Sequence, residues 1–162
     1  MIISITGTPG TGKDTISKIV AKKLGWGLID LNRLAKAKNL FKGYDKKRKC
    51  EIVDIKKLNS EIKKIKKDVI IQSHYSHELG SDLIIVLRTN PGELRKRLEK
   101  RGWSKEKIEE NVEAEIMDVC KDQAFQKTGR VFEVDTTGKK PEDSAEEIIN
   151  IIFRVGFQIK KN

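Results

Sequence analysis

Residues 7–13, with the sequence Gly-Thr-Pro-Gly-Thr-Gly-Lys, constrain the fold of this chain more than any other segment. They match the GxxxxGK part of a phosphate-binding pattern, and they lie between a β-branched run at 2–5 and a helical apolar stripe. Glycines let the backbone wrap so that successive N–H groups converge on phosphate oxygens, and the following helix presents its positive end to the same anion. The segment therefore predicts a phosphate loop for ATP, with Lys13 following the β- and γ-phosphates.

The position after the lysine departs from the pattern, because Asp14 stands where Ser or Thr normally binds Mg²⁺. Asp14 could ligate Mg²⁺ directly or through water, or it could point away and cap the helix. Its backbone N–H remains available to phosphate, and Thr15 can offer a hydroxyl to the α-phosphate. Metal binding therefore stays open between these alternatives.

Short β-branched runs alternate with amphipathic stretches along the whole chain. Strands are predicted at 2–5, 27–30, 69–71, 83–87 and 131–134, and helices after the phosphate loop, at 55–65, from Asn90, at 104–126 and from Pro141. The basic region 31–50 is weakly periodic, with a predicted turn at 43–45. Strands alternating with helices predict one α/β domain over residues 1–162, a three-layer fold with a parallel sheet and helices on both faces.

Lysines and arginines number 34 against 24 acidic residues, a net charge of +10. This excess predicts attraction to polyanions such as nucleotides or RNA, although solvated surface lysines alone would give the same balance. The two cysteines, Cys50 and Cys120, lack CxxC spacing and are predicted to be reduced packing residues. Without a signal peptide or an apolar run long enough to span a membrane, a cytoplasmic location is expected.

Four arginines, at positions 88, 95, 97 and 101, follow the fourth predicted strand. Phosphoryl transfer needs positioned cations, and ligands of parallel α/β sheets bind where strands end. Arg97 and Arg101 are four residues apart on one helical face, so both are predicted to serve the reaction, whereas Arg95 fits a surface position better.

His74 and His77 have HxxH spacing, which can indicate a metal site. Two ligands without a cysteine or carboxylate partner in range are too few for zinc. His74 is therefore predicted to lie near the transferring phosphate, and His77 to be a loop or packing residue.

Four segments together, 7–15, 34–45, 69–77 and 82–116, resemble the adenylate kinase isoenzyme 6 family, whose eukaryotic members are also called coilin-interacting nuclear ATPases. The resemblance covers nearly the whole chain, and the RGWxxxKIxENVxAE stretch at 101–115 is far more specific than the phosphate loop. It implies a five-stranded P-loop NTPase fold of the nucleoside monophosphate kinase type. It also implies a nucleoside monophosphate (NMP)-binding insertion at about 30–53 and a short lid at about 100–110.

The resemblance further implies an Mg²⁺-dependent reaction, ATP and AMP to two ADP, with possible ATPase activity in small-subunit ribosome maturation. Small-subunit ribosomal protein eleven and pre-rRNA or a 30S precursor would be the partners. The site residues that it implies are Gly10, Gly12, Lys13, Asp14, Thr15, Arg101 and Lys140 for ATP; Lys36, Tyr44 and Asp45 for the acceptor; and Lys13, His74, Arg97 and Arg101 for catalysis.

Three positions depart from this family's pattern: Asp14 and Lys36 replace a common threonine and an arginine, and Gln72 replaces an aspartate. Lys36 keeps the charge but loses the bidentate fork for phosphate. Weaker or differently arranged catalysis is therefore expected. The alternatives are a ribosome-assembly ATPase with little kinase activity, or another small-molecule P-loop kinase, although the DxD and GGG motifs of shikimate kinases are missing.

Overall fold

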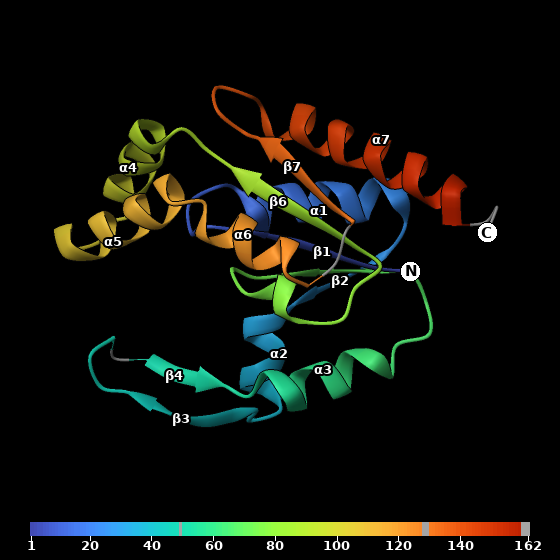
Figure 1. Cartoon of the computed structure of the whole chain (residues 1–162), viewed down its shortest axis with the longest axis horizontal. Helices are drawn as coiled ribbons and strands as arrows, with labels where there is room; N and C mark the ends of the chain where they lie inside the picture. Colours follow the sequence, from blue (N-terminus) through green and yellow to red (C-terminus); the bar gives the residue numbers. More distant parts are fainter. Residues whose placement is uncertain (49, 128–129, 160–162) are drawn as a thin grey trace.

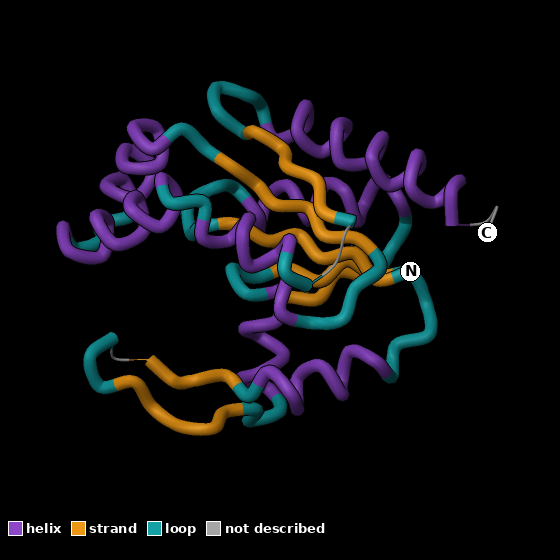
Figure 2. Tube along the Cα trace, viewed as in Figure 1, coloured by secondary structure: helices purple, strands orange, loops and turns teal. Residues whose placement is uncertain are grey.

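The computed structural model describes residues 1–48, 50–127 and 130–159. Within them, a five-stranded sheet has the strand order β2-β5-β1-β6-β7, and all its neighbours pair in parallel (Figures 1 and 2). This sheet confirms the predicted α/β fold. The strands are β1 (Ile2–Gly7), β2 (Gly27–Asp30), β5 (Val69–Gln72), β6 (Leu83–Arg88) and β7 (Val131–Asp135).

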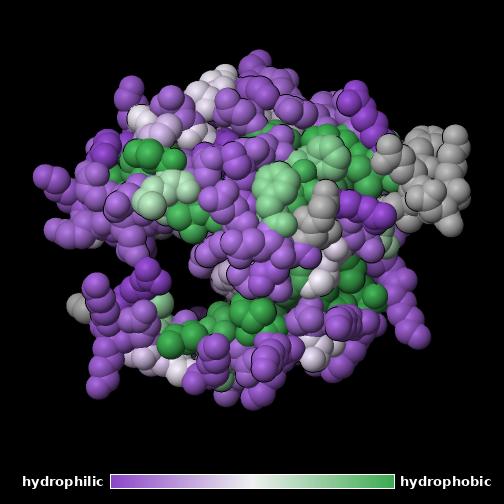
Figure 3. All heavy atoms as spheres, in the orientation of Figure 1, coloured by the Kyte–Doolittle hydropathy of each residue, from purple (hydrophilic) through white to green (hydrophobic). Residues whose placement is uncertain are grey.

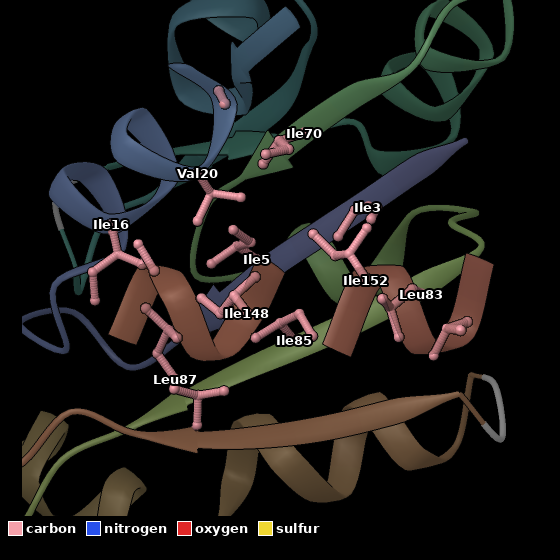
Figure 4. Packing of buried hydrophobic residues seen from close by; sticks show 14 residues of the cluster. Ile3, Ile5, Ile16, Val20, Ile70, Leu83, Ile85, Leu87, Ile148 and Ile152 are labelled. Carbon is pink, nitrogen blue, oxygen red and sulfur yellow. The ribbon is translucent and has the colours of Figure 1, made fainter. Parts of the chain in front are cut away.

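Helices cover both faces of the sheet. Helices α1 (Lys13–Leu24) and α7 (Pro141–Ile159) pack on one face, where Ile3, Ile5 and Ile85 meet them (Figure 4). Helices α2 (Leu31–Ala37), α3 (Ile55–Lys63) and α6 (Val119–Phe125) pack on the other, through clusters that include Ile71 and Ile84. Alternate side chains of one strand thus enter different clusters, which explains why the strands are continuous apolar runs.

Burial of these aliphatic side chains is the main source of stability. Helix α7 contributes Ala145, Ile148, Ile152 and Val155, which recur at intervals of three and four residues and are all buried. Each fully buried Ile or Val contributes about 1.5–3 kcal/mol relative to an exposed one. Helix α7 is therefore held firmly against α1 and this face of the sheet.

The segment between α2 and α3 forms an antiparallel hairpin of β3 (Phe41–Asp45) and β4 (Cys50–Val53). The predicted turn at 43–45 is wrong, because these residues belong to β3. The chain turns at 46–48 instead, where the Asp45 carboxylate accepts the N–H groups of Lys47 at 2.9 Å and Arg48 at 3.0 Å. Such a side-chain bond two or three residues ahead stabilises a turn after the aspartate.

The long helix predicted at 104–126 is also wrong, since the chain forms two helices, α5 (Lys105–Ile116) and α6. They are separated at Asp118, whose φ of 55° is left-handed. Its carboxylate forms ion pairs with Arg88 and Lys121, so tertiary contacts support this conformation. Helix α4 (Pro91–Lys100) packs against α5, and each begins after a capping side chain, because Asn90 and Ser104 accept N–H groups of the first turns.

Two further expectations concern the cysteines and the membrane. Both cysteines are free, and Cys120 packs beside the α6 cluster. Cys50 is exposed on β4, so its predicted packing role is wrong. In the part of the chain that the structure describes, no helix is long and apolar enough to cross a membrane.

Candidate active site

The phosphate loop connects the carboxyl end of β1 to the start of α1. Gly7, Gly10 and Gly12 have φ values of 144°, 101° and 98°, which residues with a Cβ rarely adopt. Gly12 caps α1 without a side-chain hydrogen bond, so no cap side chain competes for the N–H groups of the first helical turn. These N–H groups and the helix dipole make the loop an anion site.

Lys13 is buried at the first position of α1, with 8% of its surface exposed. Its ammonium donates to the Thr8 carbonyl at 3.2 Å. Burial lowers the pKa of Lys13 to about 8, partly offset by the nearby Cys120, Asp14 and Glu115 side chains. A buried ammonium bound to one carbonyl is incompletely compensated, and phosphate oxygens would supply the missing negative charge.

A pocket of about 470 Å³ opens on one side of the first turn of α1. It is bounded by the phosphate loop, the end of α4 and the loop before α7, and Arg101 lies on its wall. Lys140 is exposed in that last loop, between two lining residues, Lys139 and Pro141. The lining residues are Gly10, Thr11, Gly12, Thr15, Ile16, Arg97, Lys100, Arg101, Thr136, Lys139, Pro141 and Ser144.

A second pocket, of about 410 Å³, opens on the other side of the same turn. It lies between α1, α2 and the carboxyl ends of β2 and β5. Thr15 lines the first pocket and Asp14 the second, so the first turn of α1 separates them. The second pocket is lined by Asp14, Lys18, Leu28, Ile29, Asp30, Arg33, Leu34, Ala37 and Gln72.

An ion pair connects the β3–β4 hairpin to α5. Arg48, at the tip of the β3–β4 hairpin, lies 2.7 Å from Glu110 of α5, Nη2 to Oε1. Figure 3 shows a hollow between the hairpin and the helices above it. Because both partners are largely exposed, this pair contributes no more than about 1 kcal/mol and can open readily.

His74 follows β5, and its residue is exposed. Surrounding protein atoms desolvate its ring, and this effect, with the Lys13 charge next in size and His77 and Arg48 smaller, lowers the pKa of His74 to about 4. The imidazole is therefore neutral at pH 7 in the ligand-free protein. A neutral ring can donate one hydrogen bond to a phosphate oxygen without carrying a charge.

His77 is buried, as the packing interpretation predicted. Its Nδ1 lies 2.8 Å from the Thr6 hydroxyl, and its Nε2 lies 3.2 Å from the Gln123 side-chain oxygen. The Gln123 oxygen can only accept, so Nε2 carries the proton and Nδ1 accepts from Thr6. Desolvation lowers the pKa of His77, opposed by the Gln123 hydrogen bond.

We expect the free energy of unfolding to fall as the pH drops below about 6.5. In this range His77 binds a proton in the unfolded chain but stays neutral in the folded chain, where its pKa is lowered. The loss continues down to the lowered folded pKa and amounts to at most about 1.4 kcal/mol per pH unit for this group. Urea unfolding between pH 7 and 5 measures it. His77→Gln should have a shallower slope, and an unchanged slope would contradict the assignment.

The predicted catalytic arginines differ in their surroundings. Arg97 donates to the Gly10 carbonyl at 3.3 Å and to the Thr136 carbonyl at 3.2 Å, and it pairs with Glu93. It therefore holds the phosphate loop against the loop that follows β7. Arg101 is the cap residue after α4 and lines the first pocket.

The other two arginines of this group are engaged in the protein. Arg95 pairs with Glu109 on the surface, as expected. Arg88 pairs with Glu115, Asp118 and Glu133. Arg88 therefore supports the end of β6.

The expected acceptor residues do not line the second pocket. Lys36 is exposed on α2, Tyr44 is 58% exposed on β3, and the Asp45 carboxylate caps the hairpin turn. Arg33 lines it instead. The sequence could have indicated Arg33 as a binding residue. Asp30 ends a strand and can cap the helix that follows, which places Arg33 in the first turn of that helix, beside the end of the strand.

Glu115 is a second residue that sequence reasoning missed. It is the last residue of the specific 101–115 stretch, lies in the last turn of α5 and is 2% exposed, in contact with the phosphate loop and the end of β6. A buried glutamate near the end of a helix has no local signature, because its partners are far away in sequence.

Comparison with solved structures shows a fold shared with three kinases of known structure. A gluconokinase from Sinorhizobium meliloti 1021 has a TM-score of 0.63 at 12% identity, covering 98% of this chain and 94% of that chain. A deoxyadenosine kinase from M. mycoides has a TM-score of 0.60 at 19% identity, covering 95% and 100%. A shikimate kinase from Bacteroides thetaiotaomicron has a TM-score of 0.61 at 17% identity, covering 96% and 97%. At these identities the likeness shows the fold alone.

Comparison of sequences shows the family. The "AAA domain" family matches residues 3–118, more than half of the chain. A protein named "Putative adenylate kinase" from Methanosarcina acetivorans is 42% identical over 161 residues, covering 94% of this chain and 86% of the relative. A protein of the same name from Thermococcus kodakarensis is 47% identical over 156 residues, covering 95% and 86%. The chain therefore belongs to the adenylate kinase-like family of these archaeal relatives, within the AAA domain family.

Proposed function

We propose that this protein transfers the γ-phosphoryl group of ATP to AMP and releases two molecules of ADP. The observation that supports this most directly is the pair of pockets on either side of the first turn of α1. A nucleotide hydrolase or switch needs one nucleotide pocket beside the phosphate loop. A second pocket that reaches the same turn suits an acceptor whose oxygen must approach the γ-phosphate in line.

ATP would occupy the first pocket. Its phosphates would lie on the loop N–H groups at Gly10 and Gly12, with Lys13 and Thr15 beside them and Arg101 over them. The base would lie towards the loop before α7, beside Lys139 and Lys140. Cations on both sides of the phosphates offset the charge that builds on the equatorial oxygens during transfer.

AMP would occupy the second pocket, with its phosphate towards Arg33 and Lys18. The α2 helix and the hairpin would form the NMP-binding insertion, and residues 100–110 the lid. Neutral His74, whose pKa the nearby Lys13 charge helps to lower, would donate a hydrogen bond to the transferring phosphoryl group. The bond between the γ-phosphorus and the bridging oxygen breaks as an AMP phosphate oxygen attacks, and the displaced ADP keeps the electron pair.

The residues around the first turn of α1 fit a magnesium ion that is held mainly by the nucleotide. Among the described residues, no group of three or more His, Cys, Asp or Glu side chains could hold a metal by itself. Mg²⁺ in phosphoryl-transfer sites takes one or two carboxylates besides phosphates and water. Asp14 and Asp30, both on the second pocket, and the Thr15 hydroxyl offer such oxygens. When bound, Mg²⁺ would neutralise phosphate charge between the two nucleotides.

A second candidate function is ATP hydrolysis during maturation of the small ribosomal subunit, as in the adenylate kinase isoenzyme 6 family that the sequence resembles. The distribution of charge favours a polyanionic partner. Residues 31–67 hold 14 of the 34 lysines and arginines but only 4 of the 24 acidic residues, so this segment alone carries the net charge of +10. Pre-rRNA or a 30S precursor would lie against this segment, with small-subunit ribosomal protein eleven as the protein partner.

The two functions are separated by measuring ADP formation with ATP alone, with added AMP, and with added ribosomal protein or rRNA. We expect Mg²⁺-dependent ADP formation that requires AMP. Release of phosphate that rises only with the ribosomal components would favour the assembly ATPase. ADP formation with gluconate or shikimate in place of AMP would overturn both.

Arg33→Ala should raise the KM for AMP by about 10- to 100-fold, because a charge-assisted bond to phosphate is worth about 1.5–3 kcal/mol. The affinity for ATP should stay unchanged. Lys36→Ala is the matched control on the same helix, and we expect a change in KM below about threefold because Lys36 does not line the pocket. A larger effect at Lys36 than at Arg33 would contradict this assignment.

A further inference from the structure

Glu115 joins three parts of the molecule through one buried carboxylate. Its Oε2 accepts the Thr8 hydroxyl at 2.5 Å, and its Oε1 accepts Arg88 Nε at 2.7 Å and the Thr89 backbone N–H at 3.0 Å. Thr8 belongs to the phosphate loop, Arg88 and Thr89 to the end of β6, and Glu115 to the last turn of α5. The carboxylate therefore holds the loop, the sheet edge and the lid-side helix together.

Thr8 transmits this contact to the groups that meet phosphate. Thr8 is only 2% exposed, so water cannot replace Glu115 as the hydrogen-bond partner of its hydroxyl. Its carbonyl accepts Lys13 Nζ at 3.2 Å, Thr11 N at 3.2 Å and Thr11 Oγ1 at 2.9 Å. Glu115 thus fixes the side chain of Thr8, and this orients the Thr8 carbonyl. The carbonyl in turn determines the position of the Lys13 ammonium and of the loop backbone at Thr11.

Arg88 makes the arrangement rigid on the other side of the carboxylate. Its guanidinium also pairs with Asp118 and Glu133, and it donates to the Glu115 carbonyl at 2.9 Å. These contacts hold both the side chain and the backbone of Glu115 at the edge of the sheet. Charge-assisted hydrogen bonds between a guanidinium and a buried carboxylate are short and strong, so the position of α5 is tightly linked to that of Thr8.

We propose that Glu115 is a positioning residue that sets the geometry of the phosphate loop through Thr8 and links it to the α4–α5 pair. This inference rests on the proposed binding of ATP phosphates by the loop and adds a residue that touches neither nucleotide. Arg101 follows the last residue of α4, and α4 packs on α5. Helix α5 therefore supports both Arg101 of the lid and, through Glu115, the phosphate loop. A shift of α5 therefore changes the phosphate contacts from both sides.

Thr8→Val tests the proposal, because it removes the hydroxyl and keeps nearly the same shape. We expect the dissociation constant for ATP to rise by about 10- to 100-fold, the loss that follows when about one charge-assisted hydrogen bond to phosphate is misaligned. The KM for AMP should change little. Thr8→Ser restores the hydroxyl and should recover most of the ATP affinity. Glu115→Gln should be intermediate, because an amide can still accept from β6 and meet Thr8.

A matched control separates this role from general destabilisation. Ser4→Ala removes another buried hydroxyl, four residues earlier on β1, which donates to the Ser76 hydroxyl at 2.8 Å. It should lower the melting temperature yet leave ATP affinity unchanged. Titration with a fluorescent ATP analogue, well below the lowest melting temperature, gives the dissociation constants.

The outcomes distinguish this inference from the proposed reaction. Wild-type affinity for ATP in Thr8→Val, or an equal loss in Ser4→Ala, would overturn the role of Glu115. A wild-type protein that binds ATP but does not phosphorylate AMP would remove the proposed reaction. In that case a specific loss in Thr8→Val would still support the positioning role.

Discussion

Replacing Lys13 with methionine is expected to abolish phosphoryl transfer and, at the same time, to stabilise the ligand-free protein. Methionine fills similar space without the charge that would follow the β- and γ-phosphates. Removing one such electrostatic contact typically lowers kcat by about 100- to 1,000-fold or more. The gain in stability arises because the ammonium is buried, with a pKa lowered to about 8. The lowered pKa corresponds to a penalty of about 3 kcal/mol at neutral pH.

The pH dependence of this stability effect follows from the two pKa values of Lys13, about 8 in the folded chain and 10.5 in the unfolded chain. Below pH 8 the lysine is charged in both the folded and the unfolded chain, so the full penalty applies. As the pH rises from about 8 towards 10.5, the folded chain loses its proton first and the penalty disappears. The stability difference between Lys13→Met and the wild type should therefore be largest near pH 7 and shrink in this window.

Urea unfolding and ADP formation measure the two effects on the same samples. Lys22→Met, an exposed lysine on the same helix, is the control and should change neither quantity appreciably. Activity that survives in Lys13→Met would remove the phosphate-loop assignment. Loss of activity without a gain in stability would show instead that the buried ammonium is well compensated in the free protein.

The sheet could be predicted because its strands are short apolar runs between polar turns. All five predicted strands are present, since continuous apolar runs such as residues 83–87 are typical of parallel strands that are buried on both faces. The hairpin at 41–53 could not be predicted in this way. Tyr44 is 58% and Ile52 is 40% exposed, so its strands lack the pattern that burial imposes.

The division of the predicted 104–126 helix depends on contacts that are distant in sequence. Asp118 adopts a left-handed conformation while its carboxylate pairs with Arg88, thirty residues earlier. Helix propensity over residues 105–125 gives no sign of this break. Local preferences were overridden here by an ion-pair network that only the folded chain assembles.

The same reason limits what could be predicted about the site. The phosphate loop is contiguous, so its type and neighbours could be inferred from residues 7–13 alone. Arg97 instead donates to Gly10, 87 residues away, and Thr8 donates to Glu115 across 107 residues. Spacing on one helix placed Arg97 and Arg101 on the same face, but it could not show that Arg97 contacts protein carbonyls while Arg101 lines a pocket.

Gly7→Ala is expected to destabilise the protein more than any other single alanine substitution proposed for it. A Cβ at residue 7 would lie 2.5 Å from the Leu87 carbonyl oxygen and 2.9 Å from Thr11 Oγ1, at a φ of 144°. The carbonyl cannot move away freely, because Gly7 and Leu87 are paired in the sheet between β1 and β6. We expect a loss of about 3–5 kcal/mol, a large part of the 5–15 kcal/mol typical of a domain.

Gly25→Ala separates backbone strain from steric overlap in this experiment. Gly25 has a φ of 66°, and nothing lies within 4 Å of a Cβ placed there. Its substitution should therefore cost only the left-handed backbone penalty, about 1–2 kcal/mol. Urea midpoints of the two variants give the difference, which measures the contact with Leu87. Equal losses would mean that the end of β1 can shift away from β6, and the phosphate loop would then be less rigidly held than these distances require.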